Sequence, residues 1–424
     1  MAAIPVTLTR SGGAVHSVGN SVGDRPRTTT GVRGVPGDPL VDRFGRVHRD
    51  LRISLTDRCS LRCTYCMPEQ GNEWLARSSI LTVDEIERIA RVAAAAGVTT
   101  FRLTGGEPLL RADIVEVVRR LAAIRTPRGA AIDLAMTTNG IRLADLVEPL
   151  REAGLRRLNI SIDTLRRDRF HELTRRDRLP EVLAGIAAAA ASGLRPLKLN
   201  AVAMRGVNDD EIVDLVEFAL AHGAQLRFIE QMPLDAGHTW DRASMVTRAE
   251  ILETLAQRWR LTPVPGRGGA PAEKWTLDGG TATVGVIASV TAPFCGQCDR
   301  LRLTADGQLR NCLFSTGEYD LLGVLRGAPG AHRVPDAGDA AIDAGVDAVL
   351  RACVAGKLPG HAIDDPAFLQ PARGMNAIGG WAAGAQPPIG RTSCLSALRR
   401  VPPSRSPNGS RACGTPSTSS PGRP

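Results

Sequence analysis

The sequence predicts an α/β protein built on a partial (βα)6 barrel of the TIM type, followed by a smaller C-terminal domain. Two observations predict this class. Short apolar runs of strand length alternate with stretches of helical periodicity, and polar residues recur at every second position along several of the runs. Alternating strands and helices favour parallel βα units, and six units make most of a barrel. A chain of 424 residues has room for such a barrel and a further domain.

The first predicted helix is the most clearly marked element. Thr82 and Glu85 have the spacing of a capping box, apolar residues share one face after them, and Gly97 can end the helix. Further helices are predicted near 142–153, 179–192 and 208–222. The predicted strands are 51–55, 99–104, 131–137, 157–162, 196–203 and 225–231.

Polar residues two positions apart share one face of a strand. Four predicted strands carry such pairs, namely Arg52 with Ser54, Arg102 with Thr104, Asn159 with Ser161, and Lys198 with Asn200. Because buried parallel strands are otherwise almost entirely apolar, these pairs predict a polar lumen at the barrel mouth, where barrels of this type place active sites. The alternative is that loop residues have been assigned to strands.

The composition, 43% hydrophobic and 23% charged residues, is that of a globular protein. The net charge of +9 suggests a nucleic-acid or anionic-membrane partner, but its distribution does not. Residues 1–50 hold seven Arg against four Asp, and residues 381–424 hold six Arg and no acidic residue; the rest of the chain has 40 basic and 40 acidic residues. We therefore expect neither a nucleic-acid partner nor a membrane. Without an apolar run of membrane-spanning length or a signal-peptide pattern, a cytoplasmic location is predicted.

Both ends of the chain have low complexity. Residues 1–38 and 381–424 are rich in Gly, Ser, Thr, Pro and Arg and lack helical or strand periodicity, which predicts disorder.

Cys59, Cys63 and Cys66 form a C-x3-C-x2-C group just after the first strand. Three thiolates on a short loop can hold a 4Fe–4S cluster and leave one iron open to a small molecule. Zinc is the alternative, although a closed zinc site needs four ligands.

A second group of three cysteines lies in the C-terminal part of the chain. Cys295 and Cys298 are followed after thirteen residues by Cys312, among hairpin patterns at 277–280 and 304–307. A second 4Fe–4S cluster fits this group, and a zinc ribbon that lacks its fourth ligand is the alternative. Cys353, Cys394 and Cys413 stand alone and have no assigned role.

A series of ordered motifs joins these groups. They are RISLTDRCSLRCTYCMP (52–68), FRLTGGEPLLR (101–111), MTTNG (136–140), LNISID (158–163), FIEQMP (228–233), FCGQCDRLRL (294–303) and AIGG (377–380). From about residue 40 to 380 the sequence resembles the radical S-adenosylmethionine (SAM) superfamily and, within it, the GTP 3′,8-cyclase family of molybdenum cofactor biosynthesis. The resemblance implies a radical SAM barrel at 39–240 and an auxiliary-cluster and GTP-binding region at 241–380.

The resemblance also implies site residues. The first cysteine group would hold the SAM cluster, and the second an auxiliary 4Fe–4S cluster that meets the guanine ring. SAM contacts are implied for Tyr65, Gly106, Ser161 and Met232. Nucleotide contacts are implied for Arg52, Arg102, Thr137, Lys198, Arg300, Leu301 and Arg302. Only three of the 53 basic residues are lysines (Lys198, Lys274 and Lys357), so a lysine in the lumen is an unusual choice in this chain.

The activity implied is that of a lyase that cyclises GTP by radical chemistry. An electron donor, a homodimer, and product hand-over to cyclic pyranopterin monophosphate synthase are implied as well. Chains of the family end at the Gly-Gly pair, whereas here 44 residues follow Gly380, which puts activity of the full chain in question. Two alternatives stay open: a two-cluster radical SAM enzyme acting on a peptide, and a non-catalytic iron–sulfur or zinc protein.

Overall fold

The computed structural model describes residues 37–71, 73–235, 240–327 and 338–365, together with residues 368, 371 and 373. The two ends of the chain, for which disorder is predicted, lie almost wholly outside the described residues. The Gly379-Gly380 pair lies outside them as well. No helix within the described residues is long and apolar enough to cross a membrane.

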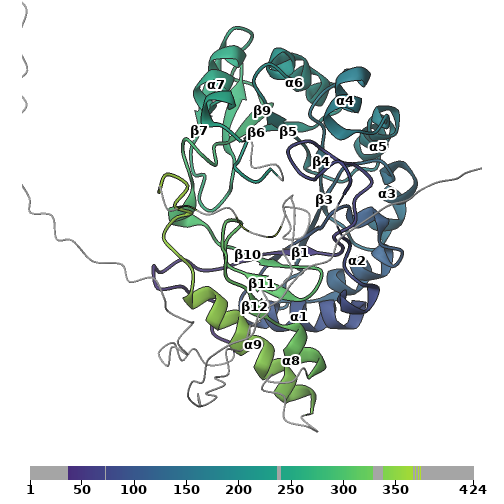
Figure 1. Ribbon diagram of the computed structural model, residues 1–424, viewed down its shortest axis with the longest axis vertical. Helices are drawn as coiled ribbons and strands as arrows, with labels where there is room; N and C mark the ends of the chain where they lie inside the picture. The colour runs from purple at the N-terminus through teal and green to yellow at the C-terminus, as the bar shows by residue number, and fades with distance from the viewer. Residues whose placement is uncertain are drawn as a thin grey trace, which may run out of the picture. The chain divides into compact units, whose positions relative to one another are not determined.

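The core of the fold is a curved parallel sheet with helices on its outer face (Figure 1). Strands β1 to β6 lie side by side in chain order, each parallel to the next. Their bounds are Asp50–Ser54, Thr100–Thr104, Asp133–Thr138, Arg157–Ser161, Leu197–Ala203 and Gln225–Glu230. The helices of this part are α1 Val83–Ala95, α2 Ile114–Ala123, α3 Leu143–Glu152, α4 Arg167–Thr174, α5 Leu179–Ala191 and α6 Ile212–Ala221.

The six predicted strands are confirmed to within two residues at each end. The helix predicted at 208–222 begins later, at Ile212, after the 3-10 turn Asp209–Glu211. Helices α2 and α4 were not predicted. The capping box of α1 is confirmed: the Glu85 amide donates to Thr82 Oγ1 at 3.2 Å, and the Thr82 amide donates to Glu85 Oε2 at 2.8 Å.

The C-terminal part of the chain extends both edges of the sheet. Strand β9 pairs parallel with β6, and β10 pairs parallel with β1. Antiparallel partners continue each edge, so the order is β12-β11-β10-β1-β2-β3-β4-β5-β6-β9-β8-β7. The predicted hairpin turns at 277–280 and 304–307 join β8 to β9 and β10 to β11. These strands are β7 Leu261–Val264, β8 Glu273–Leu277, β9 Thr283–Ile287, β10 Arg300–Leu303, β11 Gln308–Arg310 and β12 Tyr319–Asp320.

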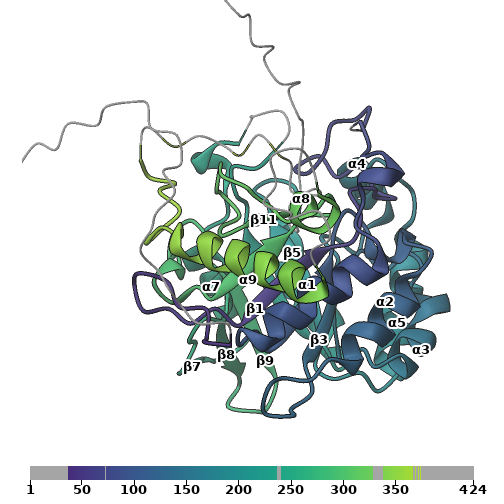
Figure 2. The same cartoon turned by 90° about the horizontal axis from the view of Figure 1, so that it is seen from below.

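Three helices complete the described fold: α7 Arg248–Ala256, α8 Leu322–Arg326 and α9 Asp339–Ala355. Helix α9 lies beside α1, far from it in sequence (Figure 2). Arg91 forms an ion pair with Asp343 at 2.9 Å across this contact. The chain that follows α9 lies next to the start of β10, because Lys357 Nζ donates to the Arg300 carbonyl at 2.7 Å.

Candidate active site

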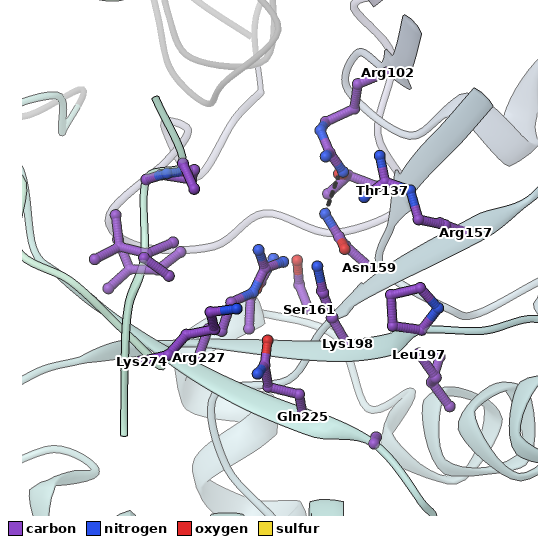
Figure 3. A pocket seen from close by; sticks show the side chains of 18 of the residues that line it. Arg102, Thr137, Arg157, Asn159, Ser161, Leu197, Lys198, Gln225, Arg227 and Lys274 are labelled. Carbon is purple, nitrogen blue, oxygen red and sulfur yellow. Dashed lines mark hydrogen bonds between the residues drawn. The ribbon is translucent and has the colours of Figure 1, made fainter. Parts of the chain in front are cut away.

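A cavity of about 1160 Å³ occupies the lumen of the barrel. Seven of the eight residues in the predicted polar pairs line it, which confirms the polar lumen; Ser54 is buried and does not line it. Figure 3 shows side chains from neighbouring strands converging on this space. Among them, Asn159 Nδ2 donates to Thr137 Oγ1 at 3.4 Å.

The lining is strongly basic. Within the described residues it holds three aspartates, Asp50, Asp163 and Asp299, and nine basic side chains: Arg52, Arg102, Arg157, Arg195, Lys198, Arg227, Lys274, Arg300 and Arg302. The buried Nε atoms of Arg52, Arg102, Arg227 and Arg300 have no hydrogen-bond partner among the described residues. Buried donors without partners are costly, so this lining fits a ligand with several negative charges.

Burial and mutual repulsion shift the pKa values of these groups. Burial, followed by the charges of Arg102 and Arg157, lowers the pKa of Arg227 to about 9. Burial also lowers the pKa of Lys198 to about 7, assisted by Arg227 and three further cations. An anionic ligand would relieve this repulsion.

Four of the cations, Arg157, Arg195, Arg227 and Lys274, were missed from the sequence. Arg157 shares a strand face with Asn159 and Ser161, and Arg227 is the register partner of Asn200. The same two-residue periodicity that identified the polar pairs would have found both arginines. Lys274 lies on β8, whose place in the sheet has no local sequence signal.

The first cysteine group follows β1 and is buried: Cys59 is 6%, Cys63 4% and Cys66 0% exposed. Burial, followed by the charge of Glu107, raises the pKa of the Cys59 thiol to about 12. Burial and the neighbouring thiols also raise the pKa values of Cys63 and Cys66. Three buried thiols within electrostatic range of one another fit an iron–sulfur cluster, because its iron supplies the positive charge that their thiolates need.

The second cysteine group is half-buried and surrounded by cations. Its three thiols line a small pocket of about 70 Å³ together with Arg300, Arg302 and His361. Burial raises the pKa of the Cys298 thiol, but Arg300 and Lys357 outweigh burial and leave the pKa lowered. Burial, followed by the charge of Cys312, raises the pKa of the Cys295 thiol. Three thiols around one small pocket, with cations beside Cys298, fit a cluster.

His361 does not complete the ligand set of the second group. Its Nε2 lies 3.0 Å from the Ser289 carbonyl, and its Nδ1 accepts from the Ile363 amide at 3.2 Å, so both ring nitrogens have partners. The described residues contain no three Cys, His, Asp or Glu side chains arranged to hold a single metal ion.

Comparison with known proteins identifies the family. The Radical SAM superfamily model matches residues 53–219, and the Molybdenum Cofactor Synthesis C model matches residues 224–344. The GTP 3′,8-cyclase of Streptomyces coelicolor is 53% identical over 345 residues, covering 80% of this chain and 96% of the relative. The GTP 3′,8-cyclase of Mycolicibacterium smegmatis is 48% identical over 382 residues, covering 88% and 100%. The chain belongs to the GTP 3′,8-cyclase family.

Solved structures add only a distant likeness. Streptococcus suis SuiB bound to S-adenosylmethionine is 16% identical, with a TM-score of 0.47 over 68% of this chain and 64% of that one. This likeness is too distant to support an assignment. The GTP 3′,8-cyclase family carries two 4Fe–4S clusters and uses SAM, which favours clusters over zinc at both cysteine groups.

The structure brings most of the predicted contact residues of this GTP 3′,8-cyclase family member to one cavity. Of the predicted SAM contacts, Tyr65, Ser161 and Met232 line it and Gly106 does not. Of the predicted nucleotide contacts, the side chain of Leu301 is fully buried in the hydrophobic core. The remaining ones, Arg52, Arg102, Thr137, Lys198, Arg300 and Arg302, line the cavity.

Gly106 also has a packing reason, beside the expected approach of its backbone to SAM. Its amide donates to the Thr56 carbonyl at 2.7 Å, and a Cβ there would lie 2.2 Å from the Arg58 carbonyl oxygen. The glycine therefore lets the GGEP turn dock on the loop that leads to the first cysteine group.

Two carboxylates near this group were also missed. Glu107 is 1% exposed and accepts from Thr138 Oγ1 and the Asn139 amide, both at 2.7 Å, and so joins the GGEP turn to the end of β3. Asp163 accepts from Tyr65 Oη at 2.6 Å and from the Val202 amide at 2.8 Å. They lie in the motifs GGEP and LNISID, so these motifs are the signal that could have identified them.

Proposed function

We propose that the chain is a GTP 3′,8-cyclase, which converts GTP to (8S)-3′,8-cyclo-7,8-dihydroguanosine 5′-triphosphate in the first step of molybdenum cofactor biosynthesis. One observation carries the proposal. A single basic cavity extends from Tyr65 and Asp163, beside the first cysteine group, to Phe294 and Arg300, beside the second. Substrate and SAM can therefore meet in one space between two clusters.

The basic side chains of the lumen bind the triphosphate in this proposal. Arg52, Arg102 and Arg227 offer buried N–H donors that have no partner among the described residues. A guanidinium presents paired donors that match phosphate oxygens, and a low-dielectric lumen strengthens each contact. Cations on several strands hold the nucleotide in one orientation, which positions its ribose for reaction.

The cysteines would hold the cofactors: Cys59, Cys63 and Cys66 the SAM cluster, and Cys295, Cys298 and Cys312 the auxiliary cluster. When bound, the cluster and SAM would supply the radical chemistry that the cyclisation of GTP requires. Tyr65, Ser161, Met232 and Asp163 orient SAM at their end of the cavity. The surrounding barrel excludes water from the reacting groups.

Further parts of the proposal concern organisation and partners. The radical SAM barrel spans 39–240, and the auxiliary-cluster region spans 241–380. The enzyme acts in the cytoplasm, receives electrons from a separate donor, forms a homodimer, and passes its product to cyclic pyranopterin monophosphate synthase.

The decisive experiment uses the anaerobically reconstituted protein with SAM, a reductant and GTP deuterated at the 3′ position. We expect deuterium in 5′-deoxyadenosine and a cyclised nucleotide triphosphate, both detected by mass spectrometry. The same assay on a chain truncated after Gly380 measures the effect of the last 44 residues. If both proteins hold two clusters and cleave SAM, yet neither transfers deuterium, the proposal is wrong.

A further inference from the structure

Lys357 is an unusual residue in this chain. Fifty of the 53 basic residues are arginines, and Lys357 is the one lysine that does not line the main cavity. It follows α9 and is 3% exposed. Its Nζ donates to the Arg300 carbonyl at 2.7 Å and lies 3.6 Å from Cys298 Sγ.

The ammonium of Lys357 has no carboxylate partner in the part of the chain that the structure describes. Asp299 lies within electrostatic range but forms no ion pair with it. Among the described residues, the Cys298 thiol is the group within contact distance that can carry negative charge, with its Sγ 3.6 Å from Nζ. A buried cation without an ion-paired carboxylate is strongly destabilising, so the position of Lys357 implies negative charge at this sulfur.

A cluster held by three thiolates supplies that charge. A 4Fe–4S cubane with three thiolate ligands is anionic, and one-electron reduction adds a further negative charge. Nearby positive charge and hydrogen bonds to the sulfurs stabilise the reduced form more than the oxidised form, and so raise the reduction potential.

We propose that Lys357 is a positioning residue that compensates the charge of the auxiliary cluster at Cys295, Cys298 and Cys312 and raises its reduction potential. This inference rests on the proposed function, because it requires that the second cysteine group holds a cluster. Sequence motifs did not identify Lys357 in this role.

Arg46 holds Lys357 in place. Its guanidinium donates to the Cys295 carbonyl at 2.7 Å and to the Leu358 carbonyl at 2.8 Å, so it ties the turn after Lys357 to the cysteine loop. Asp42 neutralises Arg46 through an ion pair of 2.6 Å. Lys357 therefore adds a buried charge to those of Arg300 and Arg302 beside the cysteines, and Arg46 fixes its position.

The test is a redox titration of the reconstituted full chain, followed by electron paramagnetic resonance. Both clusters are observed in one sample, and added SAM identifies the signal of the SAM cluster. The variants are Lys357→Met, which removes the charge and keeps the length, and Lys357→Arg, which keeps the charge. Lys274→Met is the matched control, because Lys274 contacts no cysteine in the described structure.

We expect Lys357→Met to lower the midpoint potential of the auxiliary cluster and to leave that of the SAM cluster unchanged. Lys357→Arg and Lys274→Met should leave both potentials close to those of the wild type. Selective loss of auxiliary iron in Lys357→Met, but not in Lys357→Arg, also supports compensation by charge.

Two results would overturn the inference: an unchanged auxiliary potential in Lys357→Met with full iron content, or equal effects of the Met and Arg variants. If Lys357→Met does not fold, Lys357→Arg decides, since a lowered potential with the charge retained contradicts the inference. Failure of the proposed function is seen separately, as a wild-type protein that lacks a second cluster or does not cyclise GTP.

Discussion

Each of the two cysteine groups provides three thiols for one cluster, but the surroundings of the thiols differ between the two sites. Cys59, Cys63 and Cys66 follow the carboxyl end of β1 and are buried, and burial raises the pKa of each thiol. Cys298 precedes the amino end of β10, the parallel neighbour of β1, and is half-buried beside Arg300 and Lys357. The first site thus depends on its cofactor for positive charge, whereas in the second site Arg300 and Lys357 already lower the pKa of Cys298, although burial raises that of Cys295.

Cysteine substitution separates the two sites with the largest expected effect. Cys59→Ser should reduce 5′-deoxyadenosine formation by at least about 100-fold, since even changes outside the ligand shell cost about 10–100-fold. Cys298→Ser should keep SAM cleavage but form no cyclised nucleotide, because it disturbs only the auxiliary cluster. Both products are measured by mass spectrometry in one assay. Equal loss of 5′-deoxyadenosine in the two variants would contradict this division of roles.

Substitution of an arginine in the lumen between the clusters should affect the binding of GTP rather than either cluster. Arg227→Ala removes a buried guanidinium from the cavity and should weaken GTP binding about 10–100-fold, since hydrogen bonds to charged groups contribute about 1.5–3 kcal/mol. SAM binding should change little. Isothermal titration under anaerobic conditions measures both affinities. Arg128→Ala, on an exposed turn, is the matched control and should bind both ligands as the wild type does.

A feature of this protein can be predicted from the sequence when the pattern that indicates it lies within one short segment. The strand pairs Asn159/Ser161 and Lys198/Asn200 predict the polar lumen because alternation along a strand is local. The places of Lys274 on β8 and of Lys357 after α9 depend on which sheet edge or helix the C-terminal segments contact, and no local pattern specifies that. Gly106 was recognised from its motif, whereas its close contact with the Arg58 backbone depends on how the chain folds.

A different buried carboxylate stabilises the structure around each of the two cysteine groups. Glu107 joins the GGEP turn to β3 near the first site, whereas Glu230, 0% exposed, accepts from the amides of Arg248, Val290 and Thr291 and joins β6 to the C-terminal part. Burial raises the pKa of Glu107 to about 7, so the two are compared at pH 8, where Glu107 is ionised.

Glu107→Gln and Glu230→Gln should each lower the free energy of unfolding by about 1–3 kcal/mol. The side-chain amide of each glutamine has one oxygen acceptor fewer than the carboxylate, so a buried N–H or O–H donor is left unsatisfied. Urea denaturation of the reconstituted protein measures this loss. Only Glu107→Gln should also release iron from the SAM cluster, since Asn139, which it holds, lies 3.9 Å from Cys59 Sγ. Glu148→Gln, in an exposed ion pair, is the control. Iron release from the SAM cluster in both Glu107→Gln and Glu230→Gln would show that the effect is not specific to the carboxylate near the first site.

The smallest expected effect concerns protons in the lumen. Burial, then the charges of Arg227, Arg157, Arg102 and Lys274, lower the pKa of Lys198 to about 7, so above pH 7 its amine is mostly neutral in the free enzyme. A bound triphosphate favours the charged form and raises the pKa again. GTP binding should therefore take up a proton at pH 8, and affinity should fall roughly fivefold between pH 7 and pH 8, because the amine must first be protonated.

Calorimetry at pH 8 in two buffers of different ionisation enthalpy measures the proton uptake. In Lys198→Met the uptake should be smaller by up to about one proton, and the pH dependence should flatten although binding is weaker at every pH. Titration of the phosphates of GTP is common to both proteins and cancels in this comparison. Equal proton uptake by the two proteins would mean that Lys198 does not change its protonation state when GTP binds, which would contradict this prediction.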